Sequence, residues 1–517
     1  MPYTATDHQE TKVIDMSDFT GGMRTGVPPT QIKENECELM ENMFLDPRNG
    51  RPRTRYPIEA YSTTAAPSAI NGLYVWGTSS TQTFLLTTTA AYMYYLSSLV
   101  PTSIGTLSST TRPTFCAMGD RLYVASGGVI QYTTTVATPT ALANMTGSPS
   151  TVSIIFEQYS RLVSSGDSTN TDRIYEGTYA DGTTWNTEDY ADIGYLDGTS
   201  VVGVAEAFEG LYIVFKRGRC GLRTYYATSL TDNPPSANLS TDGHAATAHA
   251  GVCWAGSRLL VMEDNYISAL VGTERQGKIE YDPSPGMKIQ GMFNATSSGF
   301  AVHYPPDFQV WFVPDPTRPE VYVYHYLRDA WSLFKFGSRR VYSACYDPVA
   351  GFLYLGCDDG VVYKYNKAAT SYHDHIGTGS TETDYTYRLI TRSYVTGNRE
   401  MVLKSPMVHW YYLDGGTGTL YAKFDYGTET QNWGTLTVSD GNVYVYDTRS
   451  GGSNEMYVYD TRLGGDDEMY VYPGSYHEEQ RADYNKPSDT FQFELRFTSG
   501  GLSLDRIVSE VSAGRRM

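Results

Sequence analysis

The feature that most constrains this chain is a strand-like signature that recurs about every 45 residues. Each copy combines an aliphatic residue with aromatic and β-branched neighbours, and most are flanked by another short apolar strand on either side. The copies are GLYVW (72–76), RLYVAS (121–126), RLVSSG (161–166), GLYIVFK (210–216), RLLVME (258–263), QVWFVP (309–314) and GFLYLGC (351–357). Alignment on Leu73, Leu122, Leu162, Leu211, Leu259, Val310 and Leu353 gives spacings of 49, 40, 49, 48, 51 and 43 residues.

A block repeat of this length is typical of a β-propeller. A four-stranded blade cannot bury both of its faces alone, so blades pack face to face around a common axis. A β-sandwich also has short strands, but it does not require such a repeat. We therefore expect six or seven blades over residues 65–370, with one blade able to be split between the two ends of the chain to close the ring.

The regions on either side of this repeat have a different texture. Longer alternating strands over residues 385–517 predict a C-terminal β-sandwich or barrel, joined by a linker at 371–384. Residues 1–64 are expected to form an N-terminal arm. Within the arm, Ile32, Leu39, Met40 and Met43 have helical spacing, which predicts one short amphipathic helix.

Composition and charge support a mainly β protein and exclude some functions. The 517 residues include 44 Tyr and 49 Gly, and only 19% are charged, which favours strands and turns. A net charge of −18 argues against wrapping nucleic acid, although DNA can pass such a surface without adhering. No apolar run reaches the roughly 18 residues of a membrane span, and the N-terminus lacks a signal-peptide layout. We expect neither membrane insertion nor export by a leader.

The candidate catalytic and metal-binding motifs all have simpler interpretations. YADGTTWN (179–186) partly matches the Asp-box of sialidases, but an Asp181-Gly182 turn before a buried Trp185 explains it. His373 and His375 would share one face of a strand, yet no third ligand is evident. Asp466, Asp467 and Glu468 lack calcium-loop spacing. The six cysteines form no C-x-x-C pair and are expected to be free, buried thiols. We predict no enzyme activity, no cofactor and no metal.

Two further segments are candidate contact sites. RNGRPRTR (48–55) places Arg48, Arg51, Arg53 and Arg55 in an otherwise acidic chain, where they favour carboxylates of a neighbouring subunit or adaptor over DNA phosphates. Residues 442–475 contain a Tyr-rich repeat at thirteen-residue spacing. Its alternation places six tyrosines on one strand face: Tyr444, Tyr446, Tyr457, Tyr459, Tyr470 and Tyr472. The repeat is either a meander covering the C-terminal domain or an insertion presenting this tyrosine ladder to a partner.

Several stretches resemble one family of viral proteins. DFTGGM (18–23), a following short helix, and the turn DPRNG (46–50) leading into basic residues are similar to the opening of phage tail proteins. YSRLVSSGDSTNTDRIYEGTYADGTTWN (159–186) resembles one of their blades, and FQFELRFTSGGLSLDRIVSEVSAGRR (491–516) resembles their closing strands. In this order, the motifs resemble the tail nozzle family of short-tailed bacteriophages, also called tail tubular protein B or the tail hub. The thirteen-residue repeats lie outside that pattern.

The resemblance implies a structural virion protein. Family members form a ring, typically of six copies, below the adaptor on the portal, around a channel that retains and then releases viral DNA. Expected partners are other copies of the chain, the adaptor, tail fibres or tailspikes, and DNA passing without sequence-specific contacts; the expected location is the virion tail, after assembly in the host cytoplasm. The alternative from a different class is a receptor-binding tail protein whose propeller binds host surface glycan, or binds and depolymerises it. Such a protein should show a pocket with aromatic rings and converging polar groups.

Overall fold

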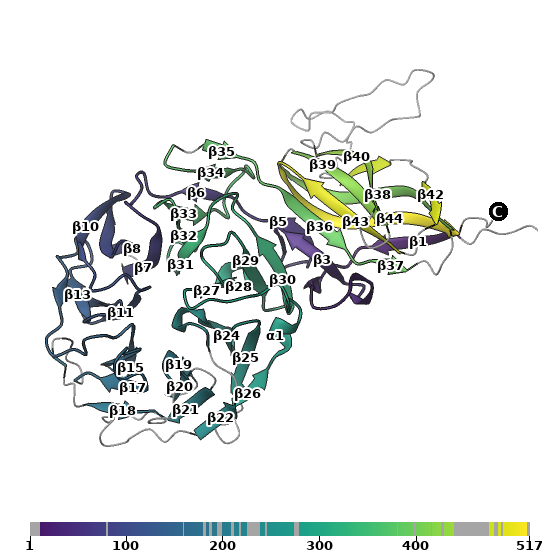
Figure 1. Ribbon diagram of the computed structural model, residues 1–517. Coiled ribbons are helices and arrows are strands. Elements are labelled where there is room, and N and C mark those ends of the chain that lie inside the picture. The colour runs from purple at the N-terminus through teal and green to yellow at the C-terminus, as the bar shows by residue number, and fades with distance from the viewer. Residues whose placement is uncertain are drawn as a thin grey trace, which may run out of the picture.

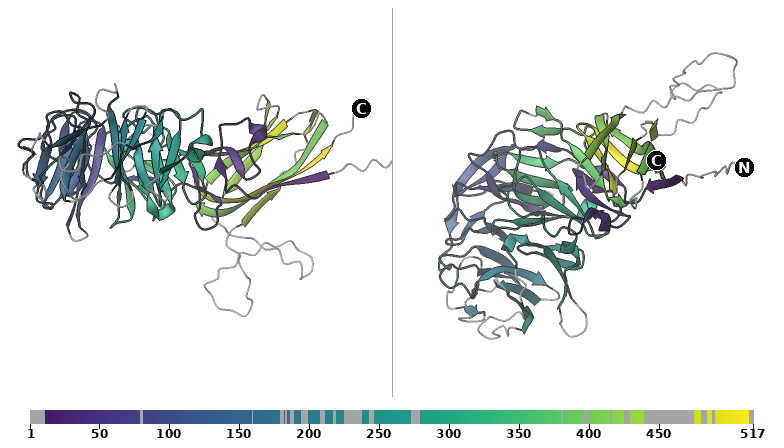
Figure 2. Two further views of the ribbon diagram at one scale, coloured as in Figure 1. Left: turned by 90° about the horizontal axis from the view of Figure 1, so that it is seen from below. Right: turned by 45° about the vertical axis from the view of Figure 1, so that its right-hand side comes forward.

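The computed structural model describes residues 11–78, 81–158, 160–178, 182, 184–185, 189–193, 199–207, 211–216, 219–224, 238–242, 246–272, 279–379, 381–395, 400–414, 416–424, 429–438, 475–479, 484–487 and 490–513. Within these ranges the chain forms a β-propeller with a β-sandwich beside it (Figure 1). The propeller is a disc, and the sandwich extends from its rim (Figure 2). No helix of the described residues is long and apolar enough to span a bilayer.

The propeller has seven blades in the described part of the chain. Five are four-stranded antiparallel sheets of consecutive strands. Blade 1 consists of β7 (Ile70–Thr78), β8 (Thr81–Thr88), β9 (Tyr92–Ser97) and β10 (Val100–Thr106). Blade 2 consists of β11 (Thr114–Met118), β12 (Arg121–Ala125), β13 (Gln131–Thr134) and β14 (Ala143–Asn144), and blade 3 of β15 (Ile154–Gln158), β16 (Arg161–Ser165), β17 (Arg173–Glu176) and β18 (Tyr190–Asp192). Blade 4 consists of β19 (Val201–Ala207), β20 (Leu211–Lys216), β21 (Arg219–Thr224) and β22 (Asn238–Asp242), and blade 5 of β23 (Val252–Ala255), β24 (Arg258–Met262), β25 (Ile267–Gly272) and β26 (Ile279–Asp282).

Blade 6 consists of β27 (Phe300–Tyr304), β28 (Gln309–Val313), β29 (Val321–His325) and β30 (Ala330–Phe334). Blade 7 has β31 (Val341–Asp347), β32 (Phe352–Cys357) and β33 (Val362–Tyr365). Its fourth strand is β6 (Ile58–Ala60), which comes before blade 1 in the sequence and pairs antiparallel with β33. In Figure 1 the purple β6 lies beside the green β33. The expected closure of the ring by a split blade is therefore confirmed.

The sequence repeat is real, but one of its seven copies is out of phase. Leu122, Leu162, Leu211, Leu259, Val310 and Leu353 all lie on the second strand of their blades, whereas Leu73 lies on a first strand, β7. Turns between first and second strands hold glycines in the left-handed region, such as Gly119 (φ +63°) and Gly256 (φ +60°). Blade strands such as β28 and β29 are buried at every residue, because neighbouring blades cover both faces. Such strands read as continuous apolar runs.

The C-terminal domain is a β-sandwich, which is one of the two forms, sandwich or barrel, that the sequence predicts. One layer is ordered β4 (Met43–Leu45), β5 (Pro52–Thr54), β44 (Gly501–Ala513), β38 (Glu400–Asp414) and β41 (Ser475–Glu479), with β1 (Thr11–Met16) on β44 and β42 (Tyr484–Pro487) on β38. The other is ordered β3 (Glu36–Glu41), β36 (Tyr387–Thr391), β43 (Thr490–Phe497), β39 (Gly416–Phe424) and β40 (Glu429–Val438), with β2 (Gly22–Met23) on β3 and β37 (Tyr394–Val395) on β43. Apolar side chains of both layers, such as Leu389, Leu495 and Leu504, form one buried cluster.

The N-terminal arm differs from its prediction. It is a set of strands that join the two domains: β3 pairs with β36 of the sandwich and, by a single bridge, with β30 of blade 6. The prediction of an amphipathic helix from Ile32 to Met43 is wrong, because these positions belong to the loop before β3, to β3 itself and to β4. In the described part of the arm, residues 11–64, the one helical turn is the 3₁₀ segment η1 (Pro29–Gln31). Elsewhere, the helical segments of the described residues are η2 (His249–Gly251), α1 (Ser284–Met287) and η3 (Pro305–Asp307).

Residues 371–384 are not an open linker. They form a hairpin of β34 (Asp374–Ile376) and β35 (Thr381–Thr383), and β34 pairs in parallel with β6 through His375 and Glu59. The hairpin thereby extends the sheet of blade 7 to six strands. The segment between the two domains is thus held by main-chain pairing to the strand that closes the propeller.

Candidate functional site

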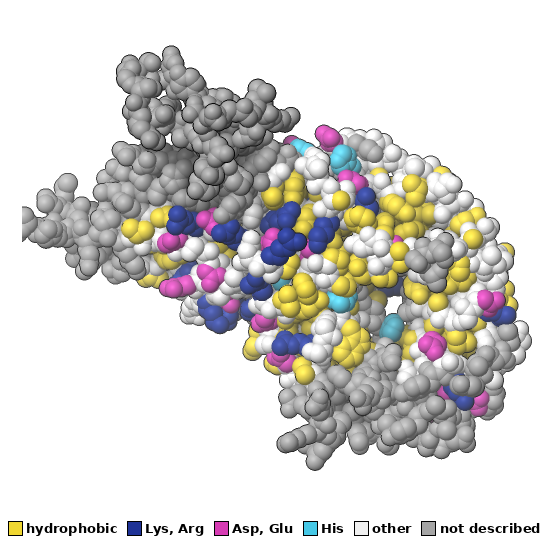
Figure 3. Space-filling model, turned by 180° about the vertical axis from the view of Figure 1, so that it is seen from behind, with side chains coloured by type: hydrophobic (Ala, Val, Ile, Leu, Met, Phe, Trp, Pro, Cys, Tyr) yellow, Lys and Arg dark blue, Asp and Glu magenta, His cyan; other side chains and the backbone are white. Residues whose placement is uncertain are grey.

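The basic segment lies at the junction of propeller and sandwich, where Lys and Arg side chains gather among acidic ones (Figure 3). It begins with a tight turn. The Asp46 carboxylate accepts the backbone N–H of Arg48 at 2.8 Å, and the N–H of Gly50 donates to the carbonyl of Asp46 at 2.7 Å. Gly50 has a φ of +76°, and a Cβ there would lie 2.9 Å from the Arg328 guanidinium. Both the backbone and the space require glycine.

Arg55 is fully buried and uses all five of its N–H donors within the chain. Its Nη atoms donate to the two carboxylate oxygens of Asp374 at 2.9 and 2.5 Å. The remaining donors reach Asn42 Oδ1 at 3.1 Å, the Tyr56 carbonyl at 2.9 Å and the Lys335 carbonyl at 3.1 Å. The guanidinium also lies over the rings of Phe336 and Tyr385, at 4.5 and 3.8 Å. The prediction that Arg55 contacts another subunit is therefore wrong, because its partners lie inside the junction.

The other three arginines differ from Arg55 in exposure. Arg53 donates to the Tyr372 hydroxyl at 2.6 Å and lies 3.8 Å from Asp46. Arg51 is half-exposed and forms a 2.7 Å ion pair with Asp505 of β44. Arg48, at the tip of the turn, is exposed. The segment thus fastens the two domains of its own chain, and an intersubunit contact stays a prediction that now rests on Arg48.

The remaining sequence candidates are partly outside the described residues. The tyrosine ladder (Tyr444, Tyr446, Tyr457, Tyr459, Tyr470 and Tyr472), Asp181 and Asp466 to Glu468 all lie there. Trp185 is buried, and the Gly182 carbonyl accepts the Tyr123 hydroxyl at 2.7 Å, in agreement with a structural turn. His373 pairs with Asp384. Within the described ranges, no group of three His, Cys, Asp or Glu side chains is placed to hold a metal ion.

The expectation of free thiols is confirmed for the cysteines whose side chains are described. Cys37, Cys116, Cys253, Cys345 and Cys357 are all free. Burial raises the pKa of each of these thiols, to about 12 for Cys116 and Cys253. Thiols held protonated in this way are poor nucleophiles.

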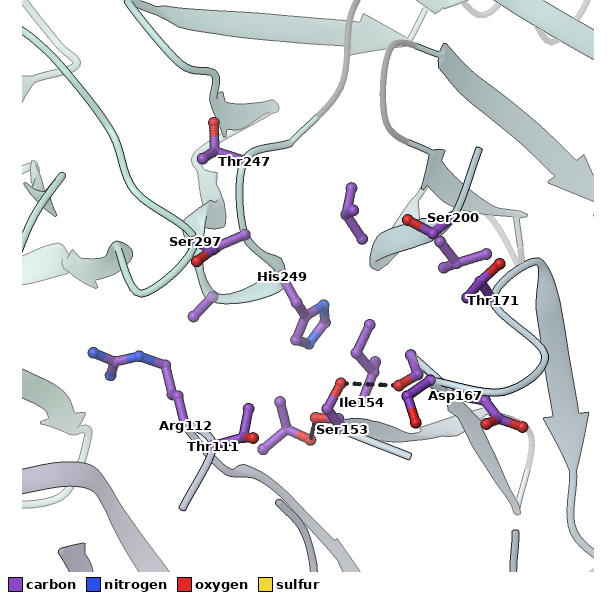
Figure 4. Close-up of a pocket in the computed structure, with 17 residues that line it drawn as sticks. Thr111, Arg112, Ser153, Ile154, Asp167, Thr171, Ser200, Thr247, His249 and Ser297 are labelled. Carbon is purple, nitrogen blue, oxygen red and sulfur yellow. Dashed lines mark hydrogen bonds between the residues drawn. The ribbon is translucent and has the colours of Figure 1, made fainter. Parts of the chain in front are cut away.

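A cavity of about 330 Å³ opens where the inner strands of blades 2 to 6 begin (Figure 4). Each of these blades contributes a hydroxyl residue shortly before its first strand: Thr111, Ser153, Ser200, Thr247 and Ser297. Sequence reasoning missed this set, although the residues recur at spacings of 42, 47, 47 and 50. They were hidden by the abundance of Ser and Thr and carry information only once the blade boundaries are known.

His249 extends into the middle of this cavity (Figure 4). Its Nδ1 accepts the backbone N–H of Val204 at 3.3 Å, so the ring proton resides on Nε2. Burial lowers the pKa of His249 to about 4, and the imidazole is neutral at pH 7. In the described part of the chain, His249 has no hydrogen bond to a Ser or Thr hydroxyl, as a serine nucleophile and its base require. The cavity offers hydrogen bonds to water or a small polar molecule.

Arg112, beside this cavity, reaches from blade 2 across to three other blades. Its Nη atoms donate to the carbonyls of Asn71 in blade 1 at 2.9 Å, Tyr342 in blade 7 at 2.6 Å and Ser298, just before blade 6, at 3.0 Å. The guanidinium lies 4.6 Å from the Phe300 ring centre. Burial lowers the pKa of Arg112 to about 10. The residue therefore acts as a clamp between blades at the axis.

These observations define the class of the protein: a seven-bladed β-propeller fastened to a β-sandwich by shared N-terminal strands. No family model matches the chain, and no curated protein matches it. Among solved structures, the chain is similar to the WD40 β-propeller domain of Doa1, with 11% sequence identity and a TM-score of 0.38 over 60% of this chain and 97% of that one. A likeness of this degree concerns the propeller fold and says nothing about function.

Proposed function

We propose that the protein is a structural tail protein of a short-tailed phage, a nozzle whose copies form a ring below the adaptor and surround a channel for DNA release. One observation carries the proposal. The motifs that resemble the nozzle family, DFTGGM and DPRNG, both lie at the junction where the propeller is fastened to the sandwich. The proposal thus rests on residues with a shared mechanical role.

The DFTGGM motif packs closely against blade 6. Phe19 and Met23 are buried in the cluster that also holds Trp331 of β30. Gly22 has a φ of +68°, and a Cβ there would lie 2.8 Å from both the Ala330 Cβ and the Trp331 backbone nitrogen. Together with the DPRNG turn against Arg328, this contact fixes the arm to the propeller at two places. A rigid two-domain unit suits a subunit that must hold its shape while DNA passes under pressure.

The charge of the chain fits a channel better than a DNA-binding surface. With a net charge of −18, a ring of many copies repels the phosphate backbone and lets DNA slide without adhering. Neighbouring copies and the adaptor are the proposed partners, with tail fibres or tailspikes also in contact. In this assignment the protein acts in the virion tail and not as an enzyme.

Native mass spectrometry and electron microscopy of the purified protein, alone and mixed with the adaptor of the same virion, test the proposal. We expect rings, of about six copies by the family resemblance, with acidic residues lining the lumen. Arg48→Glu should weaken ring or adaptor assembly, whereas Arg318→Glu, at another exposed arginine between β28 and β29, should not. A protein that stays monomeric with and without the adaptor, or a ring with a basic lumen, would refute the proposal.

A further inference from the structure

A second hollow lies between blades 2 and 3, has a volume of about 450 Å³, and shares Asp167 with the cavity at the axis. We call it the blade 2–3 groove. One wall is the segment after β14, with Ser148, Pro149 and Ser150. The other comes from blade 3, with Asp167, Thr169, Asn170, Arg173, Tyr175 and Tyr190. The groove thus combines two aromatic rings with many polar groups.

The floor of the groove is fixed by one saturated carboxylate. Asp167 Oδ1 accepts the Thr151 hydroxyl and the Thr169 N–H, and Oδ2 accepts the amide of Asn170 at 3.1 Å and the hydroxyl of Tyr175. Although burial alone would raise it, these hydrogen bonds lower the pKa of Asp167 to about 2. The carboxylate stays ionised and holds the segment in place. It has no free lone pair for a ligand and acts as a positioning residue.

Several other groups in the groove remain free to bind. Arg173 uses Nε for Asp192 at 2.8 Å and stacks on the Tyr190 ring at 3.6 Å, and its Nη donors have no partner in the described part of the chain. The Ser148 hydroxyl, by contrast, is enclosed by the protein and out of reach of a ligand. Asn170 donates through its amide nitrogen, which leaves its carbonyl oxygen as an acceptor. The free groups therefore include both donors and an acceptor.

Charge and polarity select the class of ligand. Asp167 lines the groove and Asp192 pairs with Arg173, so the groove has no excess positive charge to attract an anion. Its lining is too polar for an apolar molecule. We propose that the blade 2–3 groove binds a neutral hexopyranose unit of a surface polysaccharide. Sugar hydroxyls both donate and accept hydrogen bonds, and the C–H face of a pyranose packs on the Arg173–Tyr190 stack. This gives the tail protein a direct contact with the host surface, in addition to the proposed ring.

Saturation-transfer NMR on the full chain tests this site. The probes are maltotriose, β-1,4-galactotriose and tri-N-acetylchitotriose, with tri-galacturonate as an acidic comparison. We expect at least one neutral trisaccharide to bind and tri-galacturonate to bind more weakly. If none of the neutral probes gives a signal at about 10 mM, any binding is weaker than about −3 kcal/mol in free energy. That result would overturn the proposal.

Arg173→Lys distinguishes binding at the groove from a general loss of stability. It keeps the charge beside Asp192 but loses the planar stack on Tyr190, so binding should weaken about three- to tenfold. Arg121→Lys is the matched control: it loses a similar stack, on Tyr132 in blade 2, and should change Tm by a comparable amount while leaving binding unchanged. Equal binding by Arg173→Lys and the native protein would refute the site, whatever the outcome for ring assembly.

Discussion

Removing the guanidinium of Arg55 should destabilise the junction more than any other single change in the basic segment. In Arg55→Met the buried Asp374 carboxylate loses both charge-assisted hydrogen bonds, and among the described residues it keeps the Ile58 N–H at 3.0 Å. The carbonyls of Tyr56 and Lys335 also lose a donor, and Asn42 Oδ1 is left with the Lys335 N–H at 2.8 Å. Breaking a buried ion pair from one side costs about 3–5 kcal/mol, because the remaining charge stays desolvated.

Urea unfolding followed by circular dichroism measures this loss. Arg55→Lys should cost about 2 kcal/mol, because an ammonium has three donors and cannot replace a planar fork of five. In the double variant Arg55→Met/Asp374→Asn, part of the loss should be recovered, since the uncompensated charge is gone. Arg51→Met is the matched control: its pair with Asp505 is half-exposed and should contribute less than about 1 kcal/mol. If Arg55→Met costs no more than Arg51→Met, the junction does not depend on this pair.

Three further predictions concern other parts of the fold. Gly22→Ala should destabilise by about 2–4 kcal/mol through left-handed strain and contact with β30, whereas Gly119→Ala, with open space around its Cβ, should cost about 1 kcal/mol; thermal melts that rank the two equally would contradict this. Arg112→Met should speed amide exchange in β7, β27 and β31 but not in β19, by loss of three inter-blade hydrogen bonds. Although burial alone would raise it, hydrogen bonds from Lys423, Arg496 and Arg388 lower the pKa of Glu494 from about 4.5 to about 2. The ionised Glu494 therefore stabilises the fold fully above pH 5, and on the order of 3 kcal/mol of this stabilisation is lost as the pH falls from 4.5 towards 2. Glu494→Gln should flatten that part of an acid-unfolding curve, and an unchanged curve would refute the assignment.

The propeller could be predicted from the sequence because each blade repeats the same local pattern. Second strands such as those containing Leu122 and Leu259 are buried for the same reason in every blade, so they recur at blade length. The arm could not be read in this way. β3 lies between β30 and β36, which buries Cys37 and Met40 and leaves Leu39 partly exposed, and the two-residue alternation of a strand is lost. The resulting spacing imitates a helix.

For the candidate sites, too, the sequence shows which residue types are present but not which distant residues they contact. Four arginines within eight residues were visible in the sequence, but nothing local distinguishes Arg55 from Arg48. The partner of Arg55, Asp374, is 319 residues away in the sequence, within the segment that we predicted to be a linker. The blade 2–3 groove likewise draws Ser148 and Tyr190 from two different blades. Contacts of this kind depend on the closed ring, which the periodicity predicts only in outline.

The position of β6 near the start of the chain also delays closure of the propeller during translation. β6 leaves the ribosome roughly 300 residues before its partner β33, a delay of about 15–60 s at ordinary translation rates. During that interval the edge of β6 has no partner in blade 7. β3 waits still longer for β36, and β1 and β5 wait for β44. Blades 1 to 5 are complete hairpin sheets and can form in order as they emerge. The nascent chain therefore carries both unfinished domains at its leading end until the last strand is made, and chaperone occupancy of that end should decide how much protein matures.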